Sequence, residues 1–151
     1  MDISASLSSD REQEIMALFN SEGETLPHRM GIRITEVAPG RVVGTMPVTG
    51  NTQPYGLLHG GASCVLAETL GSCGAALQAG PGRITVGIEI NATHHRAATS
   101  GVVTGVATLI HGGRTMSTFD IAITDEAGRR VCTARLSCLH RDAVPGGPTP
   151  A

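Results

Sequence analysis

The stretch ASCVLAETLGSCGAALQ, residues 62–78, most constrains what this chain can fold into. It contains no proline and is apolar almost all round, which is typical of a buried helix rather than of an amphipathic surface helix. Gly60 and Gly61 mark its start. A helix that is apolar on every side must be surrounded by other elements, so this segment is predicted to form the centre of the fold.

Segments of extended character lie on both sides of this helix in the sequence. Before it, GIRITEVA and RVVGTMPVT flank Pro39-Gly40, a dipeptide typical of a hairpin turn. After it come four β-like segments, and in the first of them Ile84 to Ala92 alternate so that one face is predicted to be dry. The short turns between them predict that consecutive strands pair antiparallel. The four segments are residues 84–95, 102–110, 116–124 and 130–139, with turns at 99–101, 111–113 and 125–128.

These elements favour an α+β fold in which an antiparallel sheet wraps around the central helix. A shorter amphipathic helix is predicted over residues 10–20, with Asp10 as its N-cap. The 151 residues fit one domain. We expect a flexible N-terminus over residues 1–9, a folded domain over 10–141, and a disordered tail rich in proline and glycine over 142–151.

The composition excludes several classes of function. All 11 cations are arginines, they are scattered, and the formal charge is -2, so no basic field for nucleic acid is present. The absence of lysine excludes a Schiff-base lysine, a pyridoxal phosphate enzyme and a P-loop. Without a secretory signal or a membrane-spanning apolar run, we expect a cytoplasmic protein that does not engage membranes. The four cysteines are predicted to be apolar fillers rather than disulfides.

Glu68 is the one charged residue of the apolar segment. An ionised carboxylate in apolar surroundings costs several kcal/mol unless a partner compensates for it. Two interpretations are open: a structural carboxylate, satisfied in the core or facing solvent, and a catalytic base. Ser72, one turn later, shares its face and either holds the carboxylate or its water, or serves as a small packing residue.

The start of the helix offers complementary chemistry. Gly60 and Gly61 leave the first backbone N–H groups accessible, with the positive end of the helix dipole behind them, and such a place binds an anion or a developing oxyanion. The alternative is that His59-Gly60-Gly61 only satisfies backbone geometry. Gln53, just before Pro54, is either a loop side chain or a group that holds the water or the carboxylate.

The spacing of these groups adds a constraint. Glu68 lies eight residues beyond Gly60, or about 12 Å along the axis at a rise of about 1.5 Å per residue. One helix cannot easily present both to one carbonyl group. If both act on a single substrate, the carboxylate comes from a neighbouring subunit, which predicts a two-fold dimer with sites at its interface.

Two other kinds of site fit the sequence poorly. The segment Gly61-Ala62-Ser63-Cys64-Val65 lacks the second glycine of the G-x-S-x-G motif, and no strand leads directly into it, so a serine hydrolase is excluded. His94 and His95 are adjacent in a predicted strand and would point to opposite faces, which argues against a shared metal. A metal site would need further ligands that the sequence does not indicate.

The motif Gln53-Pro-Tyr-Gly-Leu-Leu-His-Gly-Gly-Ala-Ser63, followed by Val65-Leu-Ala-Glu68, resembles the hotdog-fold thioesterases of the phenylacetate-degradation type. The segment Val86-Gly-Ile-Glu-Ile-Asn-Ala92, with His94 and Arg96, extends the similarity, which covers roughly residues 29–140. The chain is most similar to 1,4-dihydroxy-2-naphthoyl-CoA thioesterases and to the proofreading thioesterase of enterobactin synthesis.

The resemblance implies an acyl-CoA thioesterase with a wrapped sheet, dimers paired into a tetramer, and no metal or cofactor. Glu68 matches the catalytic carboxylate, Gly60 the amide that polarises the thioester carbonyl, and His59 the adjacent histidine. Gln53 matches a glutamine near the attacking water and Ser72 a helper of the carboxylate. The positions implied for substrate or coenzyme A are Gly87, His94, Arg96, His111, Gly113 and Arg114.

The expected reaction is hydrolysis of an acyl-CoA thioester, with an aromatic acyl group such as dihydroxynaphthoyl favoured over a long alkyl chain. Two alternatives remain open. A hotdog hydratase or dehydratase would act on similar thioesters with a histidine and a carboxylate, although the chain lacks an Asp-x-Asn-Pro-x-x-His segment. A non-catalytic protein that binds acyl-CoA would use the same helix and glycines.

Overall fold

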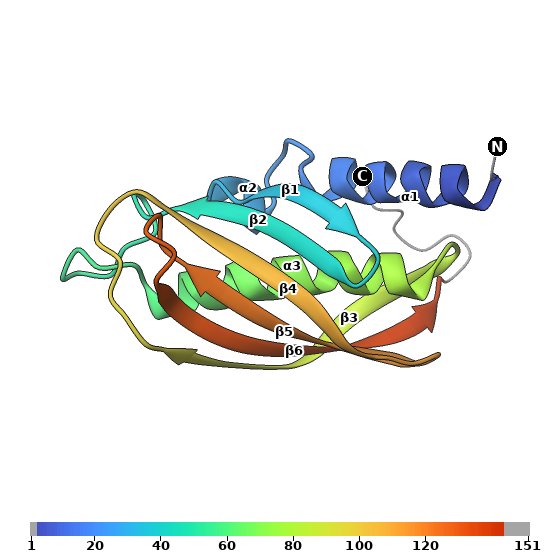
Figure 1. Ribbon diagram of the computed structural model, residues 1–151. Helices are drawn as coiled ribbons and strands as arrows, with labels where there is room; N and C mark the ends of the chain where they lie inside the picture. Colours follow the sequence, from blue (N-terminus) through green and yellow to red (C-terminus); the bar gives the residue numbers. More distant parts are fainter. Residues whose placement is uncertain (1–2, 144–151) are drawn as a thin grey trace.

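The computed structural model describes residues 3–143, and its centre is the helix α3 (Gly60–Ala79). A six-stranded antiparallel sheet wraps around this helix, as Figure 1 shows. Two further helices, α1 (Ile3–Phe19) and α2 (Leu26–Arg29), precede the edge strand β1 (Arg33–Ala38). This arrangement is the hotdog fold, so the predicted α+β architecture is confirmed. Among the described residues, no helix is long and apolar enough to cross a membrane.

The strands follow the order β1-β2-β4-β5-β6-β3 across the sheet, and each neighbouring pair is antiparallel. The hairpin predicted around Pro39-Gly40 is present, because Ala38 pairs with Arg41. Gly40 has a φ of 74°, which glycine adopts without strain. The remaining strands are β2 (Arg41–Pro47), β3 (Arg83–His94), β4 (Val102–Gly112), β5 (Met116–Thr124) and β6 (Arg130–Asp142).

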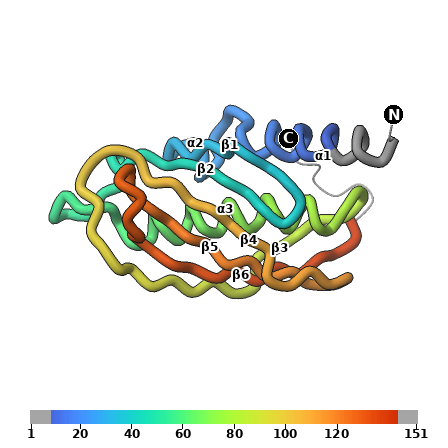
Figure 2. Tube along the Cα trace, viewed as in Figure 1, coloured from blue at the N-terminus to red at the C-terminus, as the bar shows by residue number. Residues whose placement is uncertain are grey.

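The prediction that consecutive strands pair is wrong for β3 and β4. Strand β3 pairs with β6 at the sheet edge, whereas β4 pairs with β2 and β5. The link over residues 95–101 is no tight turn: Leu58 N donates to Ala98 O at 2.8 Å, and Val48 N donates to Gly101 O at 2.9 Å. Figure 2 shows the chain passing from the edge back into the sheet around the end where α3 begins. Only a tight turn forces two strands to be neighbours, and this link is too long to do so.

The dry face predicted for the whole of β3 is also wrong. A β-bulge between Gly87 and Glu89 shifts the register against β6, and a bulge of one residue exchanges the faces on which alternate side chains lie. Ile90, after the bulge, packs against the core. The apolar residues before and at the bulge are exposed instead: Ile84 is 41% exposed, Val86 42% and Ile88 55%.

The first helix begins at Ile3, not at Asp10, so Asp10 is not its N-cap. Residues 3–9, within the segment expected to be flexible, form the first turns of α1 although their serines have a low helix propensity, and residues 1–2 lie outside the described residues. The short helix α2 has Thr25 as its N-cap, with Thr25 Oγ1 accepting from His28 N. The predicted tail lies outside the described residues from position 144 onward, and β6 continues through Asp142.

Small residues in α3 allow the sheet to approach it closely. A Cβ atom at Gly71 would lie 2.5 Å from Leu136 Cδ2, and one at Gly74 would lie 2.6 Å from Phe119 Cε1. Leu70 in turn points at two glycines, one in β2 and one in β4, where a Cβ would collide with it. Phe119, Leu136 and Leu70 are fully buried or nearly so. The seam between helix and sheet therefore has no room for an added methyl group.

We predict that Gly74→Ala lowers the free energy of unfolding by about 1–3 kcal/mol, because the new methyl group would force the Phe119 ring to move. Urea unfolding measures the change. The matched control is Gln78→Ala, at an exposed position of the same helix, for which a change below about 0.5 kcal/mol is expected. Equal effects in the two variants would contradict this account of the seam.

Candidate active site

His59 fixes the start of α3 as its N-cap. Its Nδ1 accepts a hydrogen bond from Gly61 N at 2.8 Å, so the ring is neutral at that nitrogen and any proton lies on Nε2. His59 N donates to Asn51 O at 2.9 Å. Asn51 is 9% exposed, and its Nδ2 donates to Met30 O and to Pro47 O at 2.8 Å each. The buried side-chain amide of Asn51 thus fixes the segment that binds the helix start, and the sequence alone did not indicate this residue.

Gly60 presents an open backbone amide at this point. Within residues 3–143 its N–H has no hydrogen-bond partner, whereas the Gly61 amide is used by the His59 ring. A Cβ atom at position 60 would lie 2.7 Å from His94 Nε2, so the close approach of that ring requires glycine here. The free amide stands at the positive end of the α3 dipole, which is the geometry of an oxyanion site.

A cavity of about 330 Å³ opens beside this amide. Gln53 Oε1 accepts from Tyr55 N at 3.2 Å, which leaves the Gln53 amide nitrogen available as a donor. His95 lies beside Thr133, with 3.0 Å between Nε2 and Oγ1. The cavity brings together four residues that were predicted to act, Gln53, Gly60, His94 and Arg96.

Glu68 is exposed, which corrects the expectation of apolar surroundings on every side of the helix. The sheet covers most of α3 but leaves one stripe open, and Glu68 lies on that stripe with Ser72. Both residues line a second cavity of about 320 Å³. In the isolated chain the Glu68 carboxylate therefore faces solvent and needs no buried partner to compensate for its charge, which is compatible with a structural and with a catalytic carboxylate.

A glycine and two thiols, Gly87, Cys64 and Cys138, are neighbours of the Glu68 carboxylate. A Cβ atom at Gly87 would lie 3.0 Å from Glu68 Oε1, so the glycine in the β3 bulge gives the carboxylate its space. Burial, and next the Glu68 charge, raise the pKa of Cys64. The same two effects raise the pKa of Cys138, and a hydrogen bond from Ser72 lowers it in part. Among the described residues, no hydrogen bond joins the Ser72 hydroxyl to the Glu68 carboxylate.

Glu68 and Gly60 line different cavities of one chain, as their spacing predicts. The elements that complete the Glu68 cavity come from elsewhere: Phe19 from the end of α1, and Leu26 and Pro27 from α2. The sequence could not identify these residues, because their position depends on how α1 and α2 pack beside α3.

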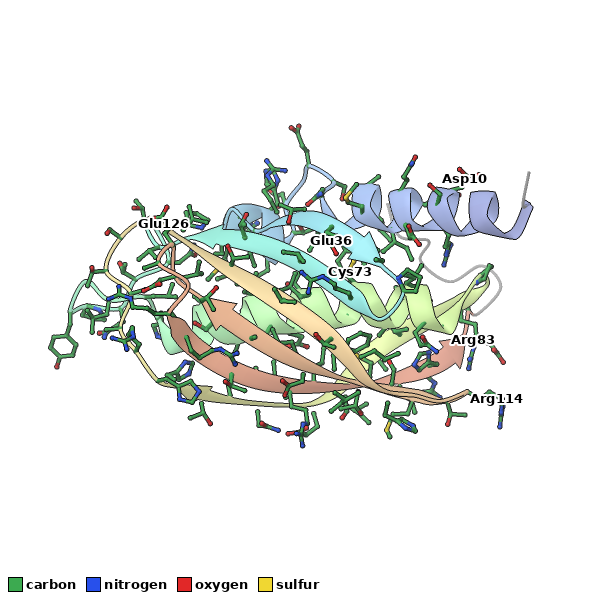
Figure 3. The ribbon with its side chains drawn as sticks, viewed as in Figure 1. Asp10, Glu36, Cys73, Arg83, Arg114 and Glu126 are labelled. Carbon is green, nitrogen blue, oxygen red and sulfur yellow. The ribbon has the colours of Figure 1, made fainter. Side chains whose placement is uncertain are left out.

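The second group of predicted substrate contacts lies at the other end of the molecule. Gly112 packs near the Gln78 side chain, close to where α3 ends, and Arg114 O accepts from Arg83 Nη1 at 2.6 Å. Figure 3 shows Arg83 and Arg114 together at this end. His111 lies within β4 rather than in a turn, because the strand continues to Gly112. One chain therefore does not bring His111, Gly113 and Arg114 to the cavity that holds Arg96.

Within the described chain, no three histidine, cysteine, aspartate or glutamate side chains gather in a way that could hold a metal ion. All four cysteines are free thiols. Three of them are buried, as expected, while Cys64 is half-buried on the open stripe of α3.

Comparison with known proteins identifies the class. Residues 55–132 match the family model described as Thioesterase superfamily. The chain is 46% identical over 127 residues to the proofreading thioesterase EntH of Klebsiella pneumoniae, covering 83% of this chain and 93% of that protein. A thioesterase structure from Haemophilus influenzae matches with a TM-score of 0.81 and 33% identity, covering 91% and 94% of the two chains. The Escherichia coli PaaI protein, from the phenylacetic acid degradation operon, shares the fold with a TM-score of 0.80 and 24% identity over 91% and 98%.

The fold and the open amide at the start of α3 thus define a hotdog thioesterase. The chain belongs to the thioesterase superfamily, a family of thioester hydrolases, and the resemblance found in its sequence is confirmed at that level.

At the far end of the sheet, His140 is 4% exposed, with 3.0 Å between its Nε2 and Ser117 Oγ. Burial, and next the Arg83 charge, lower its pKa from the ordinary 6.5. The unfolded chain takes up a proton at His140 below about pH 6.5, whereas the folded chain does so only at lower pH. The neutral His140 ring therefore contributes to the free energy of unfolding above about pH 6.5, and this contribution is lost as the pH falls further.

We predict that melting temperature falls between pH 7.5 and pH 5.5, and that His140→Gln, which keeps a donor for Ser117, shows a smaller fall. Thermal scans at both values measure this. His28→Gln, at a half-buried position of α2, is the control, and its melting temperature is expected to fall as that of the natural chain does. An unchanged fall in His140→Gln would show that His140 is not responsible.

Proposed function

We propose that the protein hydrolyses an acyl-CoA thioester to a free acid and coenzyme A, with an aromatic acyl group as in menaquinone precursors. The observation that carries this proposal is the unpartnered Gly60 amide at the dipole end of α3, in one cavity with Gln53. No metal or cofactor takes part. Such an amide stabilises the negative charge that develops on the carbonyl oxygen when a thioester is attacked.

Glu68 supplies the attacking group in this mechanism. It either removes a proton from water, which then adds to the carbonyl carbon, or adds itself to form an anhydride that water later opens. In both routes the C–S bond breaks and coenzyme A leaves as its thiolate. The Gln53 amide nitrogen, left free by the bond to Tyr55, holds the water or the carbonyl oxygen, and Ser72 borders the carboxylate.

Two structures of a Staphylococcus aureus protein support these roles. They match this chain with 35% identity and TM-scores of 0.76 and 0.75, and cover 79% and 77% of it. One carries a glutamate-to-alanine substitution and the other a glutamine-to-alanine substitution. Those two positions are separated by as many residues as Gln53 and Glu68 are here. The pair of side chains was therefore singled out in that protein as well.

The site is completed by a second subunit. Since Glu68 and Gly60 lie in different cavities, the carboxylate of one chain serves the amide of its partner. Among residues 3–143 no strand lies on the outer edge of β3, where a second copy would pair, and Ile84, Val86 and Ile88 are exposed along it. We expect a dimer, and a dimer of dimers in the full assembly.

Coenzyme A would likewise contact residues of two subunits. His94 and Arg96, in the cavity with Gly60, contact the pantetheine and phosphates. The other implied contacts, His111, Gly113 and Arg114, lie at the opposite end of the chain and serve a site of a neighbouring subunit. Gly87 contributes by leaving room for the Glu68 carboxylate.

We predict that Glu68→Gln lowers thiol release from acyl-CoA by about two to four orders of magnitude, because a general base or nucleophile is lost. A thiol-release assay with dihydroxynaphthoyl, benzoyl, phenylacetyl and fatty acyl thioesters measures it. Glu22→Gln, at an exposed loop position, is the control and keeps the natural rate. Near-natural turnover in Glu68→Gln would overturn the mechanism. Absence of thiol release from the natural chain would favour a hydratase or a binding protein.

We predict that chains carrying Glu68→Gln and chains carrying Gly60→Ala restore activity when they are co-expressed with different tags. Half of the dimers are then mixed, and each has one intact site out of two, so about a quarter of the natural rate is expected. Each variant alone stays nearly inactive, because Glu68→Gln removes the attacking group and the new Cβ at position 60 would displace the His94 ring beside the amide. If the mixture shows no more activity than its parents, while mixed dimers are purified through both tags, the shared site is wrong.

A further inference from the structure

We infer that the cavity between α3 and the α1–α2 elbow, residues 19–27, holds the acyl group of the thioester, and that Leu26 and Phe19 set its size. The inference rests on the proposed function and concerns which acyl groups the site accepts. Glu68 lies on one wall of this cavity, and Phe19, Leu26 and Pro27 form the opposite wall. A carbonyl carbon within reach of the Glu68 carboxylate places its acyl substituent between these walls.

The cavity wall has little polar character apart from Glu68. Thr69 Oγ1 donates to Val65 O at 2.7 Å, so its proton is already used within α3. What remains for a ligand is mostly the apolar surface of Val65 and of the elbow. An apolar acyl group fits such a surface, and a charged one does not.

The elbow wall is held in place by backbone hydrogen bonds. Asn20, next to Phe19, binds the edge strand β1 through two hydrogen bonds. Its Nδ2 donates to Ile34 O and its Oδ1 accepts from Ile34 N, both at 2.8 Å. Phe19 itself packs against the core. Behind α2, Ile32 N donates to Pro27 O at 2.9 Å. Because the wall is anchored to the sheet, it defines a fixed acyl space rather than a loose flap.

The volume limits the acyl class. At about 320 Å³ the cavity lies at the lower end of the range of small-molecule sites, which run from about 300 to 1,000 Å³. This space suits a ring-sized or short acyl group, and a long alkyl chain would extend beyond it. Leu26 is 55% exposed although it is large and apolar, and within the described chain it borders this space directly. It is therefore the residue most able to change acyl selectivity without disturbing the core.

The test measures kcat/KM for acetyl-CoA, naphthoyl-CoA and palmitoyl-CoA in the natural chain, Leu26→Trp and Leu26→Ala. Leu26→Trp should lower the naphthoyl value at least about tenfold relative to acetyl, because the indole fills the acyl space. Leu26→Ala should raise the palmitoyl value relative to naphthoyl by a similar factor. The matched control is Leu18→Ala, on α1 but outside this cavity, which should leave all three ratios as in the natural chain.

A second measurement separates this inference from the proposed hydrolysis. Calorimetry gives the Kd of naphthoyl-CoA for Glu68→Gln protein, with and without Leu26→Trp, and weaker binding in the double variant supports the acyl site. If the natural chain releases no thiol but Leu26→Trp still weakens naphthoyl-CoA binding, hydrolysis is wrong and the acyl site stands. If the Leu26 variants change neither the selectivity nor the affinity while their melting temperatures stay natural, the acyl site is overturned.

Discussion

The fold depends on how closely the sheet can approach α3. Where the helix meets β5 and β6 it presents Gly71 and Gly74, and the large side chains Phe119 and Leu136 occupy the space that they leave. The close contact excludes water from the seam, and it places the polar groups of α3 either at its start or on its one uncovered stripe. The helical rise over eight residues separates the open amide from the carboxylate, and the packing leaves both groups outside the seam.

The sequence predicted most elements of the fold, because their signals are local. The apolar character of residues 62–78 indicated the central helix, and the Pro39-Gly40 turn indicated the first hairpin correctly. The place of β3 was not predictable in this way. A bulge at Gly87–Glu89 changes the face of Ile84 and Val86, and the hydrogen bonds that route residues 95–101 across the end of α3 join segments far apart in sequence. Both depend on tertiary contacts that a single strand pattern does not contain.

The candidate site was predicted to a similar extent. His59 and Gly60 could be found because capping and open amides belong to the first turn of a helix, and the structure shows both features. The sequence left open whether Glu68 is buried or faces solvent, since an apolar helix gives no sign of which stripe the sheet leaves uncovered. Asn51 and the elbow residues were missed for a related reason. Each acts through a partner that only the fold brings near, such as Met30 O for Asn51.

The two hydrogen bonds between the Asn20 side chain and the backbone of Ile34 affect how the edge of the sheet can pair. A six-stranded sheet has two edges, and each edge can in principle recruit another chain through its backbone groups. On the β1 side, the Asn20 side chain occupies the N–H and C=O of Ile34 as a neighbouring strand would. If strand addition is blocked at this position of β1, a second copy would add through β3, and two copies joined edge to edge would form a closed pair rather than an open-ended fibril.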